Sequence, residues 1–484
     1  MKIAKRIFPI VVAAVSMALA GCSVGPDYEE PALNVPAGWS EAQQKGVDTR
    51  SVDLSRWWTA FDDPLLNSLV ERAVRSNLDL RIAEARIREA RASRAVVASG
   101  AWPTVDTSGS YTRSRTSENA LGIPSQSGGG GTSGGSGFKL ERDLFTAGFD
   151  ANWEIDVFGG VRRSVEAADA TIAATEYNRR DVLVSLLGEV ARNYIDLRAA
   201  QRRLAVARAN LKTQKDSLDL TRVRFDAGLA SDLDVARAEA QLNTTASQIP
   251  TLESELKGAA YSLDLLLGLS PGALWQELEK EIAIPQLPAE VLVGLPSDLL
   301  RRRPDIRVAE RRLAAATAQV GSAIADLFPK FFLIGDLGLQ SISASDWFSR
   351  GSRYWSIGPS ISWPVFDAGR IRANIEIRNA QQEQALTEYE KTVLAALGDV
   401  EKSLVNYAKE QVRYRTLNDA VAANRRAVAM AQELYIRGLN DYLNVLDTQR
   451  ELYLTESDLA QSEATMASNL VALYKALGGG WEVN

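Results

Sequence analysis

Two long stretches of the chain repeat apolar residues every seven positions, and the second stretch copies the register of the first. The first ladder consists of Leu183, Val190, Leu197, Leu204, Leu211, Leu218 and Phe225. The second, 210 positions later, consists of Val393, Val400, Tyr407, Tyr414, Val421, Val428 and Tyr435. Apolar residues spaced at about 3.5 per turn over this length predict coiled-coil packing rather than the surface helix of a compact domain.

A further ladder follows each of these at the same offset. Its two copies are Val235, Leu242, Ile249, Leu256 and Leu263, and Val445, Leu452, Leu459, Met466 and Leu473. The chain therefore contains a duplicated helix–turn–helix.

The first long helix is expected between Gly160 and Gly228, and its copy from Arg370 to Arg437. About 67 residues at 1.5 Å each give a rod of roughly 100 Å, which exceeds the width of a single domain. The two return helices are shorter, about 35 to 40 residues. Pro250 is expected to kink or break the first return helix.

Four shorter segments alternate apolar and polar residues with the period of a β-strand. Odd positions are apolar in residues 145–157 and again in residues 355–365, with aromatic residues near the ends. Less regular partners precede them at 104–113 and 330–341. This pattern is typical of strands that cross an outer membrane as part of a barrel. The alternative is a soluble two-stranded ribbon in each half of the chain.

Four strands cannot close a barrel. In hydrocarbon an open sheet edge leaves unpaired backbone groups, and known barrels begin at about eight strands. Two, three or four chains would have to contribute, so the pattern predicts a homo-oligomeric tube and leaves its order open.

Each half also opens with another helix that leads through a proline into its first strand. Seven residues of the first half recur with the same identity 226 positions later, as Arg301, Asp305, Arg307, Ala309, Glu310, Arg312 and Pro329. The Ser/Gly-rich stretch at 128–135 is expected to be a flexible extracellular loop. Three arginines before Pro304 could form an anion site, but proline and aspartate at a helix start favour a structural reading.

The N-terminus has the features of a lipoprotein signal. Lys2, Lys5 and Arg6 precede a short apolar stretch that ends in Leu-Ala-Gly before Cys22. We expect export, cleavage after residue 21 and acylation of Cys22. The alternative is a simple anchor helix with an incidental cysteine. However, a stable membrane span needs about 20 apolar residues, and this stretch is shorter.

Composition excludes several classes of function. The chain has no histidine, one cysteine and a net charge of −6, so imidazole chemistry and an internal disulfide are excluded. Nucleic acid is a poor partner for an acidic chain. No catalytic, cofactor or metal site is predicted, and no stretch after the signal is apolar enough for a membrane helix.

Several motifs, in order along the mature chain, resemble the outer-membrane factor family, in its TolC-like lipoprotein branch of tripartite efflux systems. They occupy residues 24–28, 57–58, 63–66, 301–307, 366–370 and 473–481. The resemblance implies a helix-dominated α+β fold: a homotrimer with a 12-stranded barrel, a periplasmic α-helical barrel and an equatorial belt. It also implies two protein partners: a periplasmic adaptor protein and an inner-membrane pump of the proton-driven RND type.

 No cofactor is implied, and the exported cargo would be drugs or other toxic small molecules.

The resemblance also implies a gate at the tips of the long helices. By position, Leu443 and Asp447 fall where the family has its pore constriction, with Tyr435 and Arg437 nearby. Leu443 and Asp447 are four residues apart and so share a helix face. The alternative is that Leu443 is a coiled-coil core residue and Asp447 lies on a solvated face. Arg237 stands where the second repeat has Asp447, and we expect this asymmetry to help latch the closed tip.

The two tips carry similar turns. Gly228-Leu229 in the first repeat matches Gly438-Leu439 in the second, and each glycine is expected to end its helix in a left-handed turn. These four residues are also candidates for docking the adaptor.

The expected organisation is one of two repeats behind an acylated segment, and the expected function is that of a passive exit duct. A periplasm-spanning structural lipoprotein or a lipoprotein enzyme is the alternative class, and protein secretion is the alternative within the duct class. Outer-membrane lipid would surround the strands. The expected boundaries are 1–21 (signal peptide), 22–62 (acylated segment), 63–275 (first repeat), 276–295 (equatorial linker), 296–477 (second repeat) and 478–484 (tail).

Overall fold

The computed structural model describes most of the chain as two compact units. Unit 1 comprises the described parts of Met1–Glu29, Ala90–Ile172 and Arg312–Ala385, and unit 2 those of Glu30–Glu89, Ala173–Arg311 and Leu386–Asn484. The described residues are 23–41, 47–48, 50, 53–117, 140–285, 287–288 and 291–482. The expected signal peptide, Cys22 and the Ser/Gly-rich loop at 128–135 lie outside them.

The duplicated helices are confirmed in number, length and offset. Helices α4 (Gly160–Asp226) and α9 (Arg370–Ile436) each have 67 residues. The return helices α5 (Asp232–Leu266) and α10 (Tyr442–Ala476) each have 35 residues. Both pairs keep the offset of 210 that the heptad ladders predict.

Helix α5 continues through Pro250, so the expected break is wrong. Proline removes one backbone hydrogen bond and costs about 3 kcal/mol or more inside a helix. Contacts on both sides of the proline hold α5 in place: Thr245 and Leu252 are buried, and α4 pairs with α5 through Arg222–Glu239 at 2.6 Å and Arg208–Glu253 at 2.8 Å.

The helices that precede the strands are also duplicated. Helices α3 (Leu78–Ser99) and α8 (Pro304–Ala325) each have 22 residues at the expected offset of 226. Helix α2 (Pro64–Ser76) is matched only by the short α7 (Leu299–Arg302).

The motif before α8 has the expected structural role. Pro304 begins the helix and Asp305 lies in its first turn. Arg303 pairs with Asp305 at 2.7 Å and with Asp399 of α9 at 3.1 Å, and it also donates to the carbonyl of Ala476. Its charge is therefore already neutralised within unit 2.

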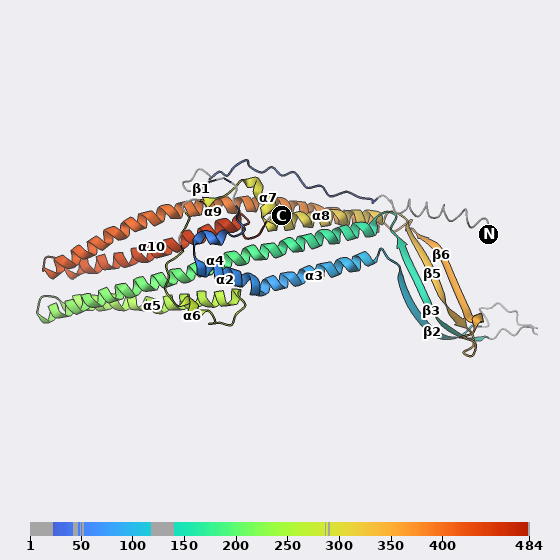
Figure 1. The fold of residues 1–484 in the computed structure, drawn as a ribbon, viewed down its shortest axis with the longest axis horizontal. Helices are drawn as coiled ribbons and strands as arrows, with labels where there is room; N and C mark the ends of the chain where they lie inside the picture. Colours follow the sequence, from blue (N-terminus) through green and yellow to red (C-terminus); the bar gives the residue numbers. More distant parts are fainter. Residues whose placement is uncertain are drawn as a thin grey trace, which may run out of the picture. The chain divides into compact units, whose positions relative to one another are not determined.

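Unit 1 contains a four-stranded antiparallel sheet (Figure 1), in the order β2-β3-β5-β6. Its strands are β2 (Thr104–Arg115), β3 (Glu141–Ile155), β5 (Lys330–Ser341) and β6 (Arg353–Ser362). Thr107 lies opposite Phe149, Phe149 opposite Leu337, and Leu337 opposite Trp355. The predicted apolar positions of all four strands therefore share one face.

Strand β6 is shorter than expected, because it ends at Ser362 and leaves out Trp363 and Val365. Pro364 lies between these two residues and has no N–H to donate to a neighbouring strand. The indole of Trp363 instead donates to the carbonyl of Leu327 at 3.0 Å.

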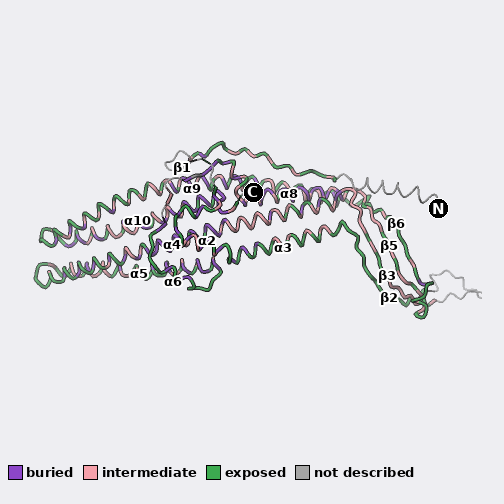
Figure 2. Tube along the Cα trace, in the orientation of Figure 1, coloured by how far each residue is buried: buried purple, intermediate pink, exposed green. Residues whose placement is uncertain are grey.

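The main core of unit 2 lies where short elements pack on the long helices, as the buried segments near α2 and α4 show (Figure 2). Leu66 and Leu69 of α2 and Leu187 of α4 are fully buried. The short elements of unit 2 are η1 (Trp57–Phe61), α6 (Trp275–Leu278), η3 (Pro296–Asp298) and the parallel strand pair β1 (Val47–Asp48) and β4 (Val291–Leu292). Another short helix, η4 (Arg350–Ser352), belongs to unit 1.

None of the helices in the described part of the chain is both long enough and apolar enough to span a membrane.

A buried hydrogen bond joins α2 to α4. Asp63 caps α2 by accepting from the backbone N–H groups of Leu65 and Leu66, and its second oxygen accepts from the Tyr194 hydroxyl at 2.7 Å. Burial, followed by the bond to Asp63, raises the pKa of Tyr194 well above its ordinary value. Tyr194 therefore stays protonated and keeps donating.

We expect Tyr194→Phe to lower the free energy of unfolding by about 1–3 kcal/mol, because it leaves a buried carboxylate oxygen without its donor. Tyr261→Phe is the matched control, since Tyr261 is 45% exposed. Denaturant unfolding followed by circular dichroism measures both; equal midpoints for the two variants would contradict the assigned role of Tyr194.

Candidate functional site

The two helix tips end in the same hydrogen-bonded turn. Gly228 and Gly438 have φ angles of +71° and +74°, so the expected left-handed turns are confirmed. In the first turn Leu229 N donates to the carbonyl of Arg224 at 2.8 Å, and in the second Leu439 N donates to that of Leu434 at 2.9 Å. Glycine suits these positions because a side chain there is strained.

The return helices begin differently after these similar turns. In α5 the Ser231 hydroxyl caps the helix, and Asp234 bonds back to the Ser231 backbone, which forms a capping box. In α10 Asp441 makes no side-chain capping bond, and Asn444 instead donates to Asn440. The first tip is therefore the more strongly capped of the two.

A buried cluster joins the two tips within the chain. It contains Leu218, Ala238, Ala431, Tyr435, Tyr442 and Val445. The rings of Tyr435 and Tyr442 are 5.5 Å apart. Arg224 of α4 lies 4.7 Å from the centre of the Tyr435 ring and donates to the carbonyl of Ile436 at 3.2 Å.

Tyr442 is held in its neutral form by this cluster. Burial is the largest cause, followed by the charges of Tyr435 and Asp234, and together they raise the pKa of Tyr442 to about 12. Ionisation of Tyr442 therefore plays no part near neutral pH.

The four candidate gate residues have different environments. Tyr435 is only 5% exposed and can affect a pore only through packing. Arg437 lies at the surface, just after the end of α9, and pairs with Glu433 of α9 at 2.5 Å. Leu443 is 42% exposed and Asp447 is exposed. Within the described residues, no hydrogen bond or ion pair engages the Asp447 carboxylate.

Both turn leucines of the candidate site are strongly exposed. Leu229 is 66% exposed and Leu439 is 71% exposed. Both are apolar side chains without cover in the single chain, which suits contact with another protein.

The polar face of the sheet carries a row of carboxylates that the sequence pattern did not single out. Asp106 lies opposite Asp150, and Asp150 lies opposite Asp336. Ser356 continues the row and donates to Asp336 at 2.7 Å. Strand register brings these residues together, so the signal was present only in the pairing of the four strands.

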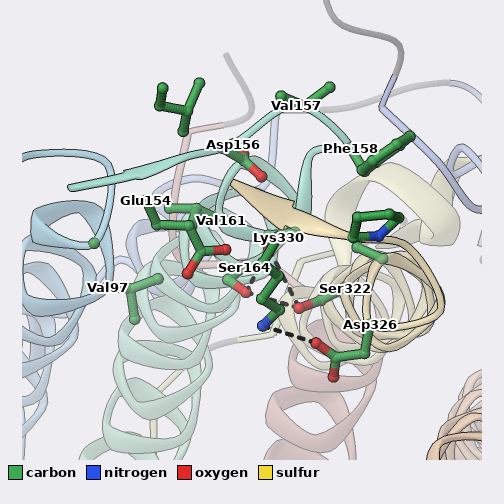
Figure 3. Close-up of a pocket in the computed structure, with 15 residues that line it drawn as sticks. Val97, Glu154, Asp156, Val157, Phe158, Val161, Ser164, Ser322, Asp326 and Lys330 are labelled. Atoms are coloured by element: carbon green, nitrogen blue, oxygen red, sulfur yellow. Dashed lines mark hydrogen bonds and ion pairs between the residues drawn. The ribbon is translucent and has the colours of Figure 1, made fainter. Parts of the chain in front are cut away.

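A pocket of about 330 Å³ lies beside the strand–helix junctions of unit 1 (Figure 3). Lys330 points into it and pairs with Asp326 at 3.0 Å, while Ser164 and Ser322 are hydrogen-bonded at 2.9 Å. The ion pair links the turn after α8 to β5, and the serine pair links α8 to α4, so both contacts have a structural role. Among the described residues, no group of three or more His, Cys, Asp or Glu side chains is arranged to hold a metal ion.

Comparison with known proteins gives the family. The family model described as "Outer membrane efflux protein" matches residues 69–269 and 295–479. The chain belongs to the outer membrane efflux protein family.

Relatives of this outer membrane efflux protein align over nearly their whole length. Nodulation protein T of Rhizobium leguminosarum bv. trifolii is 33% identical, with 96% of each chain covered. The toluene efflux pump outer membrane protein TtgF of Pseudomonas putida is 32% identical, with 97% of this chain and 96% of TtgF covered. The solved outer-membrane channel OprN is 39% identical with a TM-score of 0.86, and covers 95% of this chain and 100% of its own.

The similarity to OprN supports the helix-rich channel fold that the sequence predicts. The family match is also consistent with a sequence in which no catalytic set is predicted, since the family consists of outer membrane efflux proteins rather than enzymes. The comparisons do not assign roles to the tip residues.

We expect Gly438→Ala to destabilise the second tip by about 1–2 kcal/mol, because alanine is strained in the left-handed region. Gly398→Ala, inside the helix α9 that precedes this turn, is the control: a Cβ there meets nothing within 4 Å, and alanine should stabilise an exposed helical position by about 1 kcal/mol. Hydrogen exchange of α9 measures both changes. Slower exchange at the tip of Gly438→Ala would contradict the left-handed turn.

Proposed function

We propose that this outer membrane efflux protein is the exit duct of a tripartite efflux pump. It passively conducts drugs or other small toxic molecules from the periplasmic adaptor and inner-membrane pump to the exterior. The duct is closed at its periplasmic helix tips until the adaptor docks. The name of the relative TtgF, a toluene efflux pump outer membrane protein, supports a small-molecule cargo.

The observation that carries the proposal is a sheet with one apolar face and two free edges. Strands β2 and β6 each pair on one side only. In hydrocarbon their free N–H and C=O groups would each cost several kcal/mol. Pairing β2 of one chain with β6 of the next removes both edges, and three chains give the 12-stranded barrel that the family resemblance implies.

Apolar side chains left uncovered on the long helices support the same assembly. Val223 of α4 is 65% exposed, and Leu394 and Met430 of α9 are 69% and 67% exposed. Neighbouring copies of the chain would cover such residues in a ring of helices. The homotrimer would then form the periplasmic helical barrel that the family resemblance implies.

The gate proposal rests on the exposure of Leu443 and Asp447. Three copies of Leu443 around an axis would form an apolar constriction, and three copies of Asp447 a ring of like charge that favours cations. Arg237 also has no ion-pair partner among the described residues. It is therefore available to pair with an acidic group of another chain and so to latch the closed tips.

The remaining organisation follows from the same proposal. Acylated Cys22 anchors the protein in the outer membrane, and residues 22–62 follow it. The repeats at 63–275 and 296–477 each supply two strands and one helical hairpin to the tube. The exposed turns at Gly228-Leu229 and Gly438-Leu439 are the proposed docking points for the adaptor, where uncovered leucines can be buried.

We expect Leu443→Ala/Asp447→Ala to raise the steady conductance of the protein in a planar bilayer at least tenfold, because it removes both the apolar constriction and its charge. Leu454→Ala/Asp458→Ala is the matched control, with the same spacing and exposure on the same helix about three turns from Leu443.

Low conductance of the wild type and the control, beside high conductance of the gate variant, supports the proposal. Equal conductance of all three inserted oligomers would place the constriction elsewhere. Failure to form heat-resistant oligomers in the outer membrane would instead favour a structural lipoprotein.

The carboxylate row should bias the open duct towards cations. In the proposed barrel, Asp106, Asp150 and Asp336 of each chain face the lumen and would attract cations. We expect their joint replacement by asparagine, in the open-gate background, to lower the cation-to-anion permeability ratio severalfold. Reversal potentials in a salt gradient measure this ratio. Asp143→Asn, on the opposite face of the sheet, is the control, and an equal effect of the control would contradict the luminal assignment.

A further inference from the structure

The residues that follow Cys22 lie against unit 1 where strand β3 gives way to helix α4. Val24 N donates to the carbonyl of Phe158 at 3.2 Å. A Cβ placed on Gly159 would lie only 3.0 Å from the Cα of Ser23. Ser23 and Val24 are therefore in direct contact with the junction between β3 and α4.

Arg163 of α4 makes most of the polar contacts to this segment. Its Nε donates to the carbonyl of Val24 at 3.1 Å, and its Nη2 donates to the carbonyl of Gly25 at 3.4 Å and to Asp27 Oδ1 at 2.7 Å. The remaining nitrogen donates to Glu166 at 2.8 Å. The side chain of Arg163 is only 4% exposed, so the segment covers a guanidinium that would otherwise face solvent.

The charge of Arg163 is maintained by its two carboxylate partners. Burial acts to lower the pKa of Arg163, but the hydrogen bonds to Asp27 and Glu166 outweigh it and raise the pKa above its ordinary value. Asp27 itself is 87% exposed. Its interaction with Arg163 can therefore be removed without opening a core.

Two glycines make the close approach possible. Gly25 has a φ of +90°, and a Cβ on it would lie 2.4 Å from the Cα of Gly321 in α8. A Cβ on Gly321 would in turn lie 3.0 Å from Arg163 Cδ. The segment thus crosses α8 where neither backbone carries a side chain, and this crossing brings its carbonyl groups within reach of Arg163.

We propose that Arg163 is a positioning residue that docks the N-terminal segment on the rest of unit 1 and so fixes the lipid anchor beside the strand–helix junction of its own chain. The second part rests on the proposed acylation of Cys22, which is one peptide unit, about 3.8 Å, before Ser23. Without docking, the seven residues 23–29 would form a tether with a reach of up to about 25 Å. Docking removes this freedom and sets where the acyl chains enter the membrane relative to the sheet.

Hydrogen exchange of the purified, acylated protein tests this proposal. We expect Asp27→Asn, Gly25→Ala and Arg163→Gln each to increase exchange of the peptide that contains Val24 at least tenfold. The first change removes the carboxylate partner, the second removes the space for the crossing and the third removes the donor. Asp27→Glu keeps the carboxylate and should restore slow exchange.

Arg94→Gln is the matched control. Arg94 pairs with Asp169 at 2.9 Å in the same unit, and both side chains are about half exposed. We expect this variant to leave exchange of the N-terminal segment unchanged. Peptides from β3 and β5 should stay protected in Asp27→Asn and Gly25→Ala, which shows that the unit remains folded even if Arg163→Gln does not fold.

Unchanged exchange of the segment in both Asp27→Asn and Gly25→Ala would overturn the proposal, and so would equal loosening in Arg94→Gln. The mass of the N-terminal peptide reports acylation separately. An unmodified peptide with slow exchange at Val24 would refute the anchor but keep the docking, whereas an acylated peptide with fast exchange would refute the docking alone.

Discussion

The need to pair every backbone hydrogen-bonding group in the sheet constrains the rest of unit 1. Three of the four strand contacts that a closed structure requires of each chain are made internally, between β2 and β3, β3 and β5, and β5 and β6. The fourth can come only from another chain once the sheet is in hydrocarbon. In the proposed barrel, the antiparallel register would then decide which side chains face lipid and which face the lumen. A one-residue slip would exchange the two faces.

The two repeats share their geometry but differ in chemistry at the tips. Phe225 and Tyr435 occupy equivalent rungs of the heptad ladders, yet Phe225 is 42% exposed and Tyr435 is 5% exposed. The N-termini of the return helices also differ: α5 has a capping box, and α10 has none. The second hairpin has the weaker helix start and the better buried tyrosine. Its stability therefore depends more on packing against α4 than on local capping.

Much of this fold could be predicted from the sequence because its patterns are long. Seven rungs at one spacing identified α4 and α9 as long helices, the glycines at 160 and 228 indicated the ends of α4, and the alternation in residues 145–157 identified β3. Local exceptions were harder: the pattern shows that Pro250 lacks an N–H but not that Thr245 and Leu252 are buried on either side of it. Contacts between distant segments left no periodic signal, which is why the Asp106–Asp150–Asp336 row and the docking of Val24 on Arg163 emerged only from the folded chain.

The equal lengths of α4 and α9 have a consequence for how this sequence can change over time. One residue inserted into α4 would move its tip by about 1.5 Å and turn it by about 100° relative to α9. Leu218 would then no longer face Tyr435 and Val445, with which it shares a buried cluster. Insertions and deletions in the two helices are therefore coupled: a change of length in one copy would persist only with a matching change in the other, although the duplicated sequences are otherwise free to diverge.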